Sequence, residues 1–143
     1  MAINFDNFKQ EESTFLNKLA KNLGHPQEKS RTGILVKAVL HALRDRIMIR
    51  EALEFFTQLP TFLKVVFVEN WKYNDKPERL RDKEEFLSKI EVLQVTYGED
   101  EFSWSKSTEE LTATVFESLN EYLIKGEMQE VTNQLPADMK VYF

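Results

Sequence analysis

The sequence predicts an all-α protein, built as an internally duplicated helical bundle. Three observations support this prediction. Gly and Pro are scarce, with four of each in 143 residues, which leaves little material for the tight turns that join strands. Apolar residues recur at helical spacing along most of the chain. The tripeptide Gln-Leu-Pro occurs at 58–60 and again at 134–136, and at this offset of 76 the run 35–67 aligns without a gap on 111–143, with 11 of 33 positions identical.

We expect a single domain of two four-helix repeats, about 5–71 and 83–143, with a pseudo-twofold relation. A polar linker over 72–82 joins them. A chain of this length buries about two-thirds of its unfolded surface, so its core needs no metal or disulfide. The absence of Cys excludes a disulfide scaffold, a thiol nucleophile and a thiolate metal site. No run suits a membrane span or a signal peptide, so a cytoplasmic location without membrane contact is expected.

Four helices are expected in the first half. Apolar stripes place them at about 8–23, 31–47, 50–58 and 60–71. Gly24 is positioned to cap the C-terminus of the first helix. Pro60 opens the fourth, because proline fits the first helical turn, where its missing N–H has no partner. This fourth helix is apolar on most sides, so it is expected to be buried or covered by a partner.

The second half is expected to repeat this plan. Its helices should lie at about 83–97, 107–123, 127–134 and 136–143. Residues 92–97 carry β-branched side chains and would suit a strand, but their counterparts in the first half favour a helix. Ser107 and Glu110 form a capping box for the next helix. A loop at 98–105 is longer than its counterpart by about five residues.

The net charge of −5 argues against a dedicated nucleic-acid binder. The halves differ, however: residues 1–70 hold 10 basic and 8 acidic side chains, and residues 71–143 hold 9 and 16. A basic group in the first half could be solvated with local ion pairs, or could pair with acidic residues of the second half. The basic group is Lys37, Arg44, Arg46 and Arg50, and the acidic residues are Glu109, Glu110, Glu117 and Glu121.

Two pairs of side chains four residues apart are candidate metal ligands. His41 and Asp45 form one pair, and Glu117 and Glu121 occupy the aligned positions of the second half. Four such groups in a helical bundle could hold zinc or iron, but none lies in the Glu-x-x-His pattern of di-iron bundles. A solvated or salt-bridged surface is the interpretation we favour. No metal, cofactor or catalytic residue is predicted, because no phosphate loop, nucleophile elbow or His-Glu-x-x-His motif is present.

Two tryptophans are not explained by the apolar stripes. Trp71 ends the fourth helix, and Trp104 lies in the longer loop among Ser and acidic residues. Each is either an exposed anchor for a partner or a lid that folds back over the core, and we favour the lid. The repeated Gln-Leu-Pro is interpreted as a structural joint between the third and fourth helices of each half.

An ordered series of motifs resembles a known bacterial family. The series comprises His-Ala-Leu-Arg-Asp-Arg-Ile at 41–47, the first Gln-Leu-Pro, Trp71, Pro77, Glu-Glu-Phe-Leu at 84–87, Gly-Glu at 126–127 and Leu-Pro at 135–136. The family is catalogued as domain of unknown function 2267. The chain departs from its pattern at Phe-Phe-Thr, 55–57. The resemblance implies an all-helical, duplicated fold in a small bacterial cytoplasmic protein and brings no activity, cofactor or catalytic residue.

The function predicted from these observations is a non-catalytic helical interaction or ligand-binding module, with a protein partner or self-association. Its contact candidates are His41, Arg44, Arg46, Arg50, Trp71 and Trp104. One alternative is a metal-dependent or other enzyme with a site between the halves, drawing on the His41, Asp45, Glu117 and Glu121 group. A second alternative is weak nucleic-acid binding through the basic first half.

Overall fold

The computed structural model describes residues 5–72, 76–99 and 101–142. Within these residues the chain forms seven α-helices and two short 3₁₀ helices and no strand, which confirms the all-α prediction. In chain order the elements are α1 (Phe5–Asn22), α2 (Lys29–Arg46), α3 (Ile49–Gln58), α4 (Thr61–Val68), α5 (Lys83–Thr96), α6 (Thr108–Leu119), η1 (Asn120–Tyr122), α7 (Glu127–Thr132) and η2 (Ala137–Tyr142).

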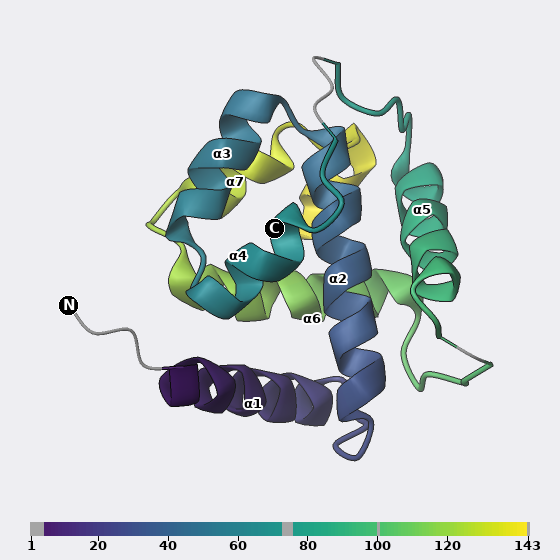
Figure 1. Ribbon diagram of the computed structural model, residues 1–143. Coiled ribbons are helices and arrows are strands. Elements are labelled where there is room, and N and C mark those ends of the chain that lie inside the picture. The colour runs from purple at the N-terminus through teal and green to yellow at the C-terminus, as the bar shows by residue number, and fades with distance from the viewer. Residues whose placement is uncertain (1–4, 73–75, 100, 143) are drawn as a thin grey trace.

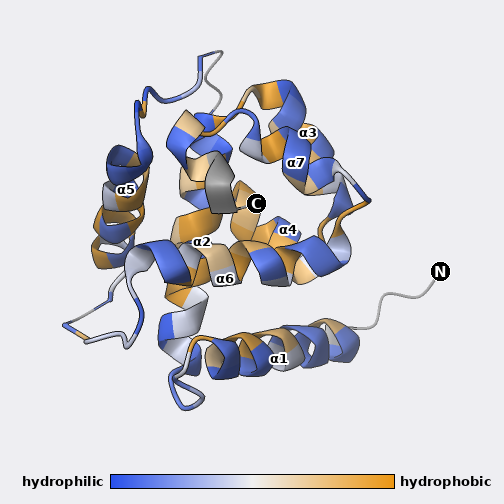
Figure 2. Cartoon of the chain, turned by 180° about the vertical axis from the view of Figure 1, so that it is seen from behind, coloured by the Kyte–Doolittle hydropathy of each residue, from blue (hydrophilic) through white to orange (hydrophobic). Residues whose placement is uncertain are grey.

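Helix α2 is the centre of the fold. It packs against α1, α4, α5 and α6, and its residues from Leu35 to Leu43, other than Lys37, are buried. Figure 1 shows α2 running through the middle of the molecule, with α1 across one end, α6 crossing it and α5 alongside. In Figure 2 the hydrophobic residues of α1 lie along the edge of the helix nearest the rest of the molecule, and Phe15, Leu19 and Ala20 of this helix are buried. One helix therefore supplies core surface to elements of both halves.

The first-half helices follow the predicted order, with one difference in length. Gly24 adopts φ +89°, as expected for a residue that caps α1. Helix α4 was expected to reach Trp71 but ends at Val68. Asn70, just beyond it, has φ +56°, a left-handed conformation that no α-helix continues through. Trp71 consequently lies outside the helix.

In the C-terminal part of the second half, the α-helices are shorter than predicted and 3₁₀ helices replace part of them. Helix α5 covers the β-branched segment as expected, and Ser107 caps α6, its Oγ accepting from the Glu110 N–H at 3.2 Å. The stripe expected to run to Leu123 passes from α6 into the 3₁₀ turn η1, and the last helix is η2, a 3₁₀ helix rather than an α-helix. Of the residues predicted for it, Phe143 lies outside those described.

The two Gln-Leu-Pro segments form a reciprocal contact between α3 and α7. The side-chain oxygen of Gln134 accepts from the backbone N–H of Met48 at 2.7 Å, and that of Gln58 accepts from the N–H of Ile124 at 2.8 Å. Both donors and both acceptors stand 76 residues apart in the sequence. Each glutamine thus satisfies a backbone N–H of the opposite half, at the start of α3 in one case and just before α7 in the other.

Candidate functional site

His41 is buried, with 1% of its surface exposed, so the expectation of a solvated side chain is wrong. Its Nε2 lies 2.7 Å from the Val66 carbonyl oxygen and its Nδ1 lies 2.6 Å from the Tyr97 hydroxyl. A carbonyl only accepts, so Nε2 carries the proton and Nδ1 accepts from Tyr97. Burial lowers the pKa of His41, which keeps the ring neutral. Both ring nitrogens are hydrogen-bonded, so His41 has a structural role: it connects α2 to α4 and to Tyr97 at the end of α5.

Arg44 is also buried, although it was predicted as part of a surface basic group. Its guanidinium donates from Nη1 to the carbonyls of Phe67 at 2.7 Å and Glu69 at 3.0 Å, and from Nε to Asp45 at 2.9 Å. These carbonyls close the C-terminal end of α4, where a cation is favoured by the helix dipole. Arg44 therefore satisfies carbonyls at the C-terminal end of α4, and the left-handed Asn70 just beyond them prevents the helix from continuing to Trp71.

The remaining basic candidates do not converge. Arg50 is exposed, and Arg46 is half-buried on the last turn of α2. Trp71 is half-buried over Phe67, with the Arg44 guanidinium 5.7 Å from its ring centre. Arg44 and Trp71 line a hollow of about 480 Å³ beside Lys76, Pro77 and Glu78. A contact role for Arg46, Arg50 and Trp71 stays a prediction.

Trp104 folds back onto the corner between α1 and α2, as the lid interpretation predicted. Its ring meets His25 edge to face at 5.4 Å, and its Nε1 donates to Glu99 at 3.1 Å. The next residue, Ser105, donates its backbone N–H to His25 Nε2 at 2.9 Å. Phe102 stacks edge-on against the same imidazole. The longer loop of the second half thus attaches to the first half.

The four candidate metal ligands, His41, Asp45, Glu117 and Glu121, are not brought together. Among the described residues, no three of them place their ligand atoms close enough to hold one ion. His41 uses both nitrogens as above, Asp45 pairs with Arg44, and Glu121 pairs with Lys18 of α1 at 2.7 Å. Glu117 is exposed. An enzyme site built from this group is therefore not supported.

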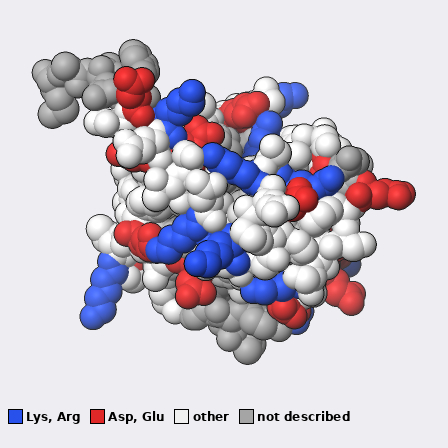
Figure 3. Space-filling view, turned by 90° about the horizontal axis from the view of Figure 1, so that it is seen from below, with Lys and Arg blue, Asp and Glu red and all other residues white. Residues whose placement is uncertain are grey.

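An ion pair joins the two halves to each other, but its lysine, Lys18, lies outside the predicted basic group. Lys18 reaches Glu121, while Lys37 pairs with Glu69 in its own half and Lys83 pairs with Glu109. On the face seen in Figure 3, Lys and Arg side chains lie among Asp and Glu side chains and do not form a single basic patch. Weak nucleic-acid binding stays a prediction, without the buried Arg44 as a contact.

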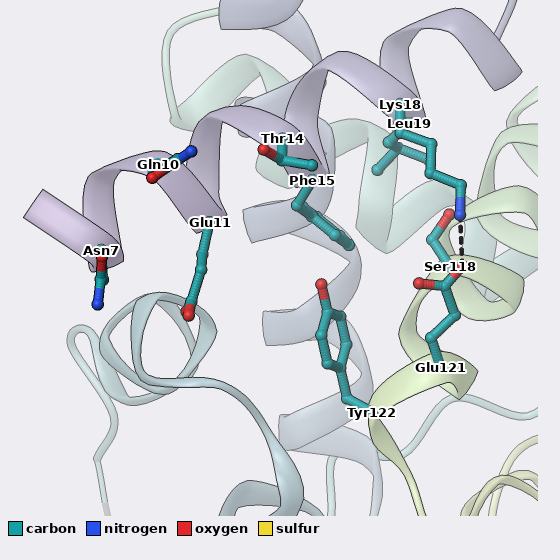
Figure 4. Close-up of a pocket in the computed structure, with 10 residues that line it drawn as sticks. All are labelled: Asn7, Gln10, Glu11, Thr14, Phe15, Lys18, Leu19, Ser118, Glu121 and Tyr122. Atoms are coloured by element: carbon teal, nitrogen blue, oxygen red, sulfur yellow. Dashed lines mark hydrogen bonds and ion pairs between the residues drawn. The ribbon is translucent and has the colours of Figure 1, made fainter.

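A pocket of about 410 Å³ lies where α1 meets α6 and η1. It therefore stands between the predicted halves. Figure 4 shows Glu11 and Phe15 reaching in from α1 and the Tyr122 side chain reaching in from the opposite wall. Its lining residues are Asn7, Gln10, Glu11, Thr14, Phe15, Lys18, Leu19, Ser118, Glu121 and Tyr122. Seven of these ten side chains are polar or charged, and Phe15, Leu19 and Tyr122 supply its apolar and aromatic surface.

The pocket lining carries more negative than positive charge, with Glu11 and Glu121 against Lys18. The Lys18 ammonium is paired with Glu121, whereas Glu11 forms no ion pair with any described residue. Burial, with smaller contributions from Glu121 and Glu11, raises the pKa of the Tyr122 hydroxyl, so it remains a neutral donor. Phe15 and Tyr122 lie with ring centres 6.0 Å apart. The pocket thus has one uncompensated carboxylate beside two aromatic rings.

Sequence reasoning singled out Glu121 but missed Glu11 and Tyr122. Glu11 is one of many exposed acidic residues on amphipathic helices, and nothing in its spacing marks it. Tyr122 follows the predicted stripe of the α6 helix and would be assigned to the core. These side chains come together only because α1 crosses η1 in the folded protein. The local sequence around either element does not predict that crossing.

In the part of the chain that the structure describes, no helix has the length and apolar character needed to cross a membrane. A family model described as an uncharacterized conserved protein, DUF2267, matches residues 12–142. The comparison with curated proteins gives no match.

Proposed function

Since the chain belongs to the DUF2267 family, whose description names no activity, we propose a function from the pocket itself: a non-catalytic module that binds a small organic amine between α1 and α6. The observation that carries the proposal is the uncompensated Glu11 carboxylate beside the rings of Phe15 and Tyr122. An ammonium group complements a carboxylate and also binds favourably over an aromatic face.

The lining chemistry supports binding rather than catalysis. The pocket-lining residues include no His, the side chain most often used as a general base, and no Cys, the most readily activated nucleophile. Its hydroxyl and amide groups can orient a ligand by hydrogen bonds. We place this module in the bacterial cytoplasm, on the resemblance and the absence of Cys described above.

Titration of the protein with benzylamine and with benzoate, followed by amide chemical shifts, tests the proposal. Benzylamine is expected to bind and to shift amides of α1, α6 and η1, whereas benzoate should not. Glu11→Gln should weaken benzylamine binding about tenfold, since a charge-assisted hydrogen bond is worth roughly 1.5–3 kcal/mol. Glu12→Gln is the matched control, because the adjacent Glu12 does not line this pocket. Equal binding of both probes, no binding of benzylamine, or equal effects of the two variants would refute it.

We further propose that the two halves are copies of one four-helix unit with a pseudo-twofold relation. The reciprocal bonds of Gln58 and Gln134, at the same 76-residue offset as the sequence repeat, support this. Exchange of the segments 48–60 and 124–136 tests it. A folded chain with a helical content like that of the parent is expected, and an unfolded chain would count against equivalent environments.

A further inference from the structure

Four glutamates of α3 and α7 share one place in the fold, away from the pocket. Glu51 and Glu54 are three residues apart on α3, and Glu127 and Glu130 are three apart on α7. This spacing puts each pair on one helix face. Both glutamates of each pair are identical in the 76-residue alignment. Helices α3 and α7 pack against each other, and they lie side by side in Figures 1 and 2.

The four side chains converge. One carboxylate oxygen from each lies within 4.8 Å of the corresponding oxygen of the other three. Four carboxylates at this separation repel strongly unless something positive lies among them. Among the described residues, no Lys or Arg forms an ion pair with any of the four.

Glu127 provides a second, independent observation that points to a ligand. Its surface is 3% exposed, and its Oε1 is buried without a hydrogen-bond partner among the described residues. The Oε1 of Glu51 is likewise buried and has no hydrogen-bond partner among the described residues. An unpaired buried carboxylate oxygen is costly, so such groups are normally protonated or bound to a cation. The side chain is aimed into the cluster, since its ligand atom lies among the other three.

Proton affinities agree with this geometry. Burial, followed by the charge of Glu127, raises the pKa of Glu51 to about 7, and burial raises the pKa of Glu127 although Gln58 and Glu51 oppose the rise. Both acids thus lack a compensating positive charge in the chain itself.

We propose that Glu51, Glu54, Glu127 and Glu130 form a binding site for one hard divalent cation, with Ca²⁺ as the best fit. Ligands on opposite sides of a Ca²⁺ ion stand about 4.6–5.2 Å apart, twice the usual Ca–O distance, so one ion can reach all four oxygens. An all-carboxylate site suits Ca²⁺, Mg²⁺ or Mn²⁺ rather than zinc or copper. The site is independent of the amine pocket and joins α3 of the first half to α7 of the second.

Calorimetric titration of the EDTA-treated and desalted protein with CaCl₂, MgCl₂ and MnCl₂ tests the site. We expect one ion per chain and a higher Tm in Ca²⁺ than in EDTA, because a ligand that binds only the folded state stabilises it. Glu127→Gln and Glu51→Gln should each weaken Ca²⁺ binding at least tenfold. In the parent protein, Mn²⁺ should broaden amide signals of α3 and α7 before those of α5.

The matched control is the double variant Glu84→Gln with Glu91→Gln, which removes two exposed carboxylates from α5. It should bind Ca²⁺ like the parent. Folding of the cluster variants is checked by thermal unfolding in EDTA, where they should be at least as stable as the parent because a like-charge contact is removed. Absence of binding for all three ions at millimolar concentration, control and cluster variants with equal losses, or Mn²⁺ broadening elsewhere would overturn the proposal.

Discussion

His41 is a residue whose environment fixes its charge. The ring is held between the Val66 carbonyl and the Tyr97 hydroxyl, and the charged groups around it are Lys37, Arg44 and Asp45. Its hydrogen-bonding pattern is complete only in the neutral form, since Nδ1 must accept from Tyr97. Protonation of Nδ1 would place two donors face to face unless the tyrosine hydroxyl turned away.

This state has a consequence for stability against pH. Because burial lowers the folded-state pKa of His41, its contribution is complete above the unfolded pKa of about 6.5 and is lost as pH falls toward the lower folded pKa. Urea unfolding at pH 7, 6 and 5 should show a smaller acid-induced loss in His41→Gln than in the parent. Parallel losses in the two proteins would show that His41 is not responsible.

Arg44 is expected to contribute more to stability than any exposed arginine. Arg44→Met removes the donor for the carbonyls of Phe67 and Glu69, so unfolding free energy should fall by about 2–4 kcal/mol. Chemical denaturation measures this change. Arg50→Met is the control, because Arg50 is exposed and such substitutions usually cost less than about 0.5 kcal/mol. Similar losses in the two variants would contradict the capping role.

These two residues show where single-sequence reasoning stops. His41 and Arg44 fall off the apolar stripe of α2, and polarity alone suggests that they face solvent. They are buried because α4 and α5 cover that side of α2, which gives α2 neighbours nearly all round. The four glutamates were missed for a related reason: two Glu-x-x-Glu spacings are common on helices, and only the packing of α3 on α7 makes them one cluster.

At the scale of elements, the positions of the helices could be predicted from apolar periodicity and from capping and turn residues. The end of α4 was harder to predict, because a residue of another helix contributes to it. Gly24 and Ser107 act as the sequence indicated, because capping is local. The end of α4 combines a local feature, the left-handed Asn70, with carbonyl hydrogen bonds from Arg44 of another helix, and only the second depends on the tertiary fold. The Gln-Leu-Pro segments do join the third and fourth helices, but their glutamines also bond across to the opposite half.

Those glutamines allow a paired prediction. Gln58→Ala and Gln134→Ala should each lower unfolding free energy by about 1 kcal/mol, because each leaves one backbone N–H of the opposite half without its acceptor. Equilibrium urea denaturation measures both. Gln27→Ala, at an exposed turn position, should be neutral. A clearly larger loss for one of the pair would argue against equivalent roles.

At the scale of the whole molecule, one core serves both halves. Buried residues of α1 to α4 and of α5 to α7 belong to a single cluster, and the Trp104 loop attaches the second half to the first. Domains of this size with one core usually unfold in a single step. The predicted division into two halves therefore describes the order of the helices along the chain. We do not expect the halves to unfold as separate units.

The two tryptophans allow this cooperativity to be measured. In Trp104→Phe the fluorescence reports on Trp71 of the first half, and in Trp71→Phe it reports on Trp104 of the second. Within each variant, the fluorescence transition should coincide with the loss of helical circular dichroism. A fluorescence transition that precedes the loss of helix in either variant would show that one half unfolds alone.

The reciprocal glutamine bonds have a consequence for assembly. Each bond joins one half to the other and never a half to itself. If two chains exchanged their second halves, the same bonds, and the same meeting of α3 with α7, would form between chains instead of within one. The closed and exchanged forms would then share nearly all contacts. Protein concentration during refolding, and the length of the segment over 72–82, would decide between a monomer and an interlocked dimer.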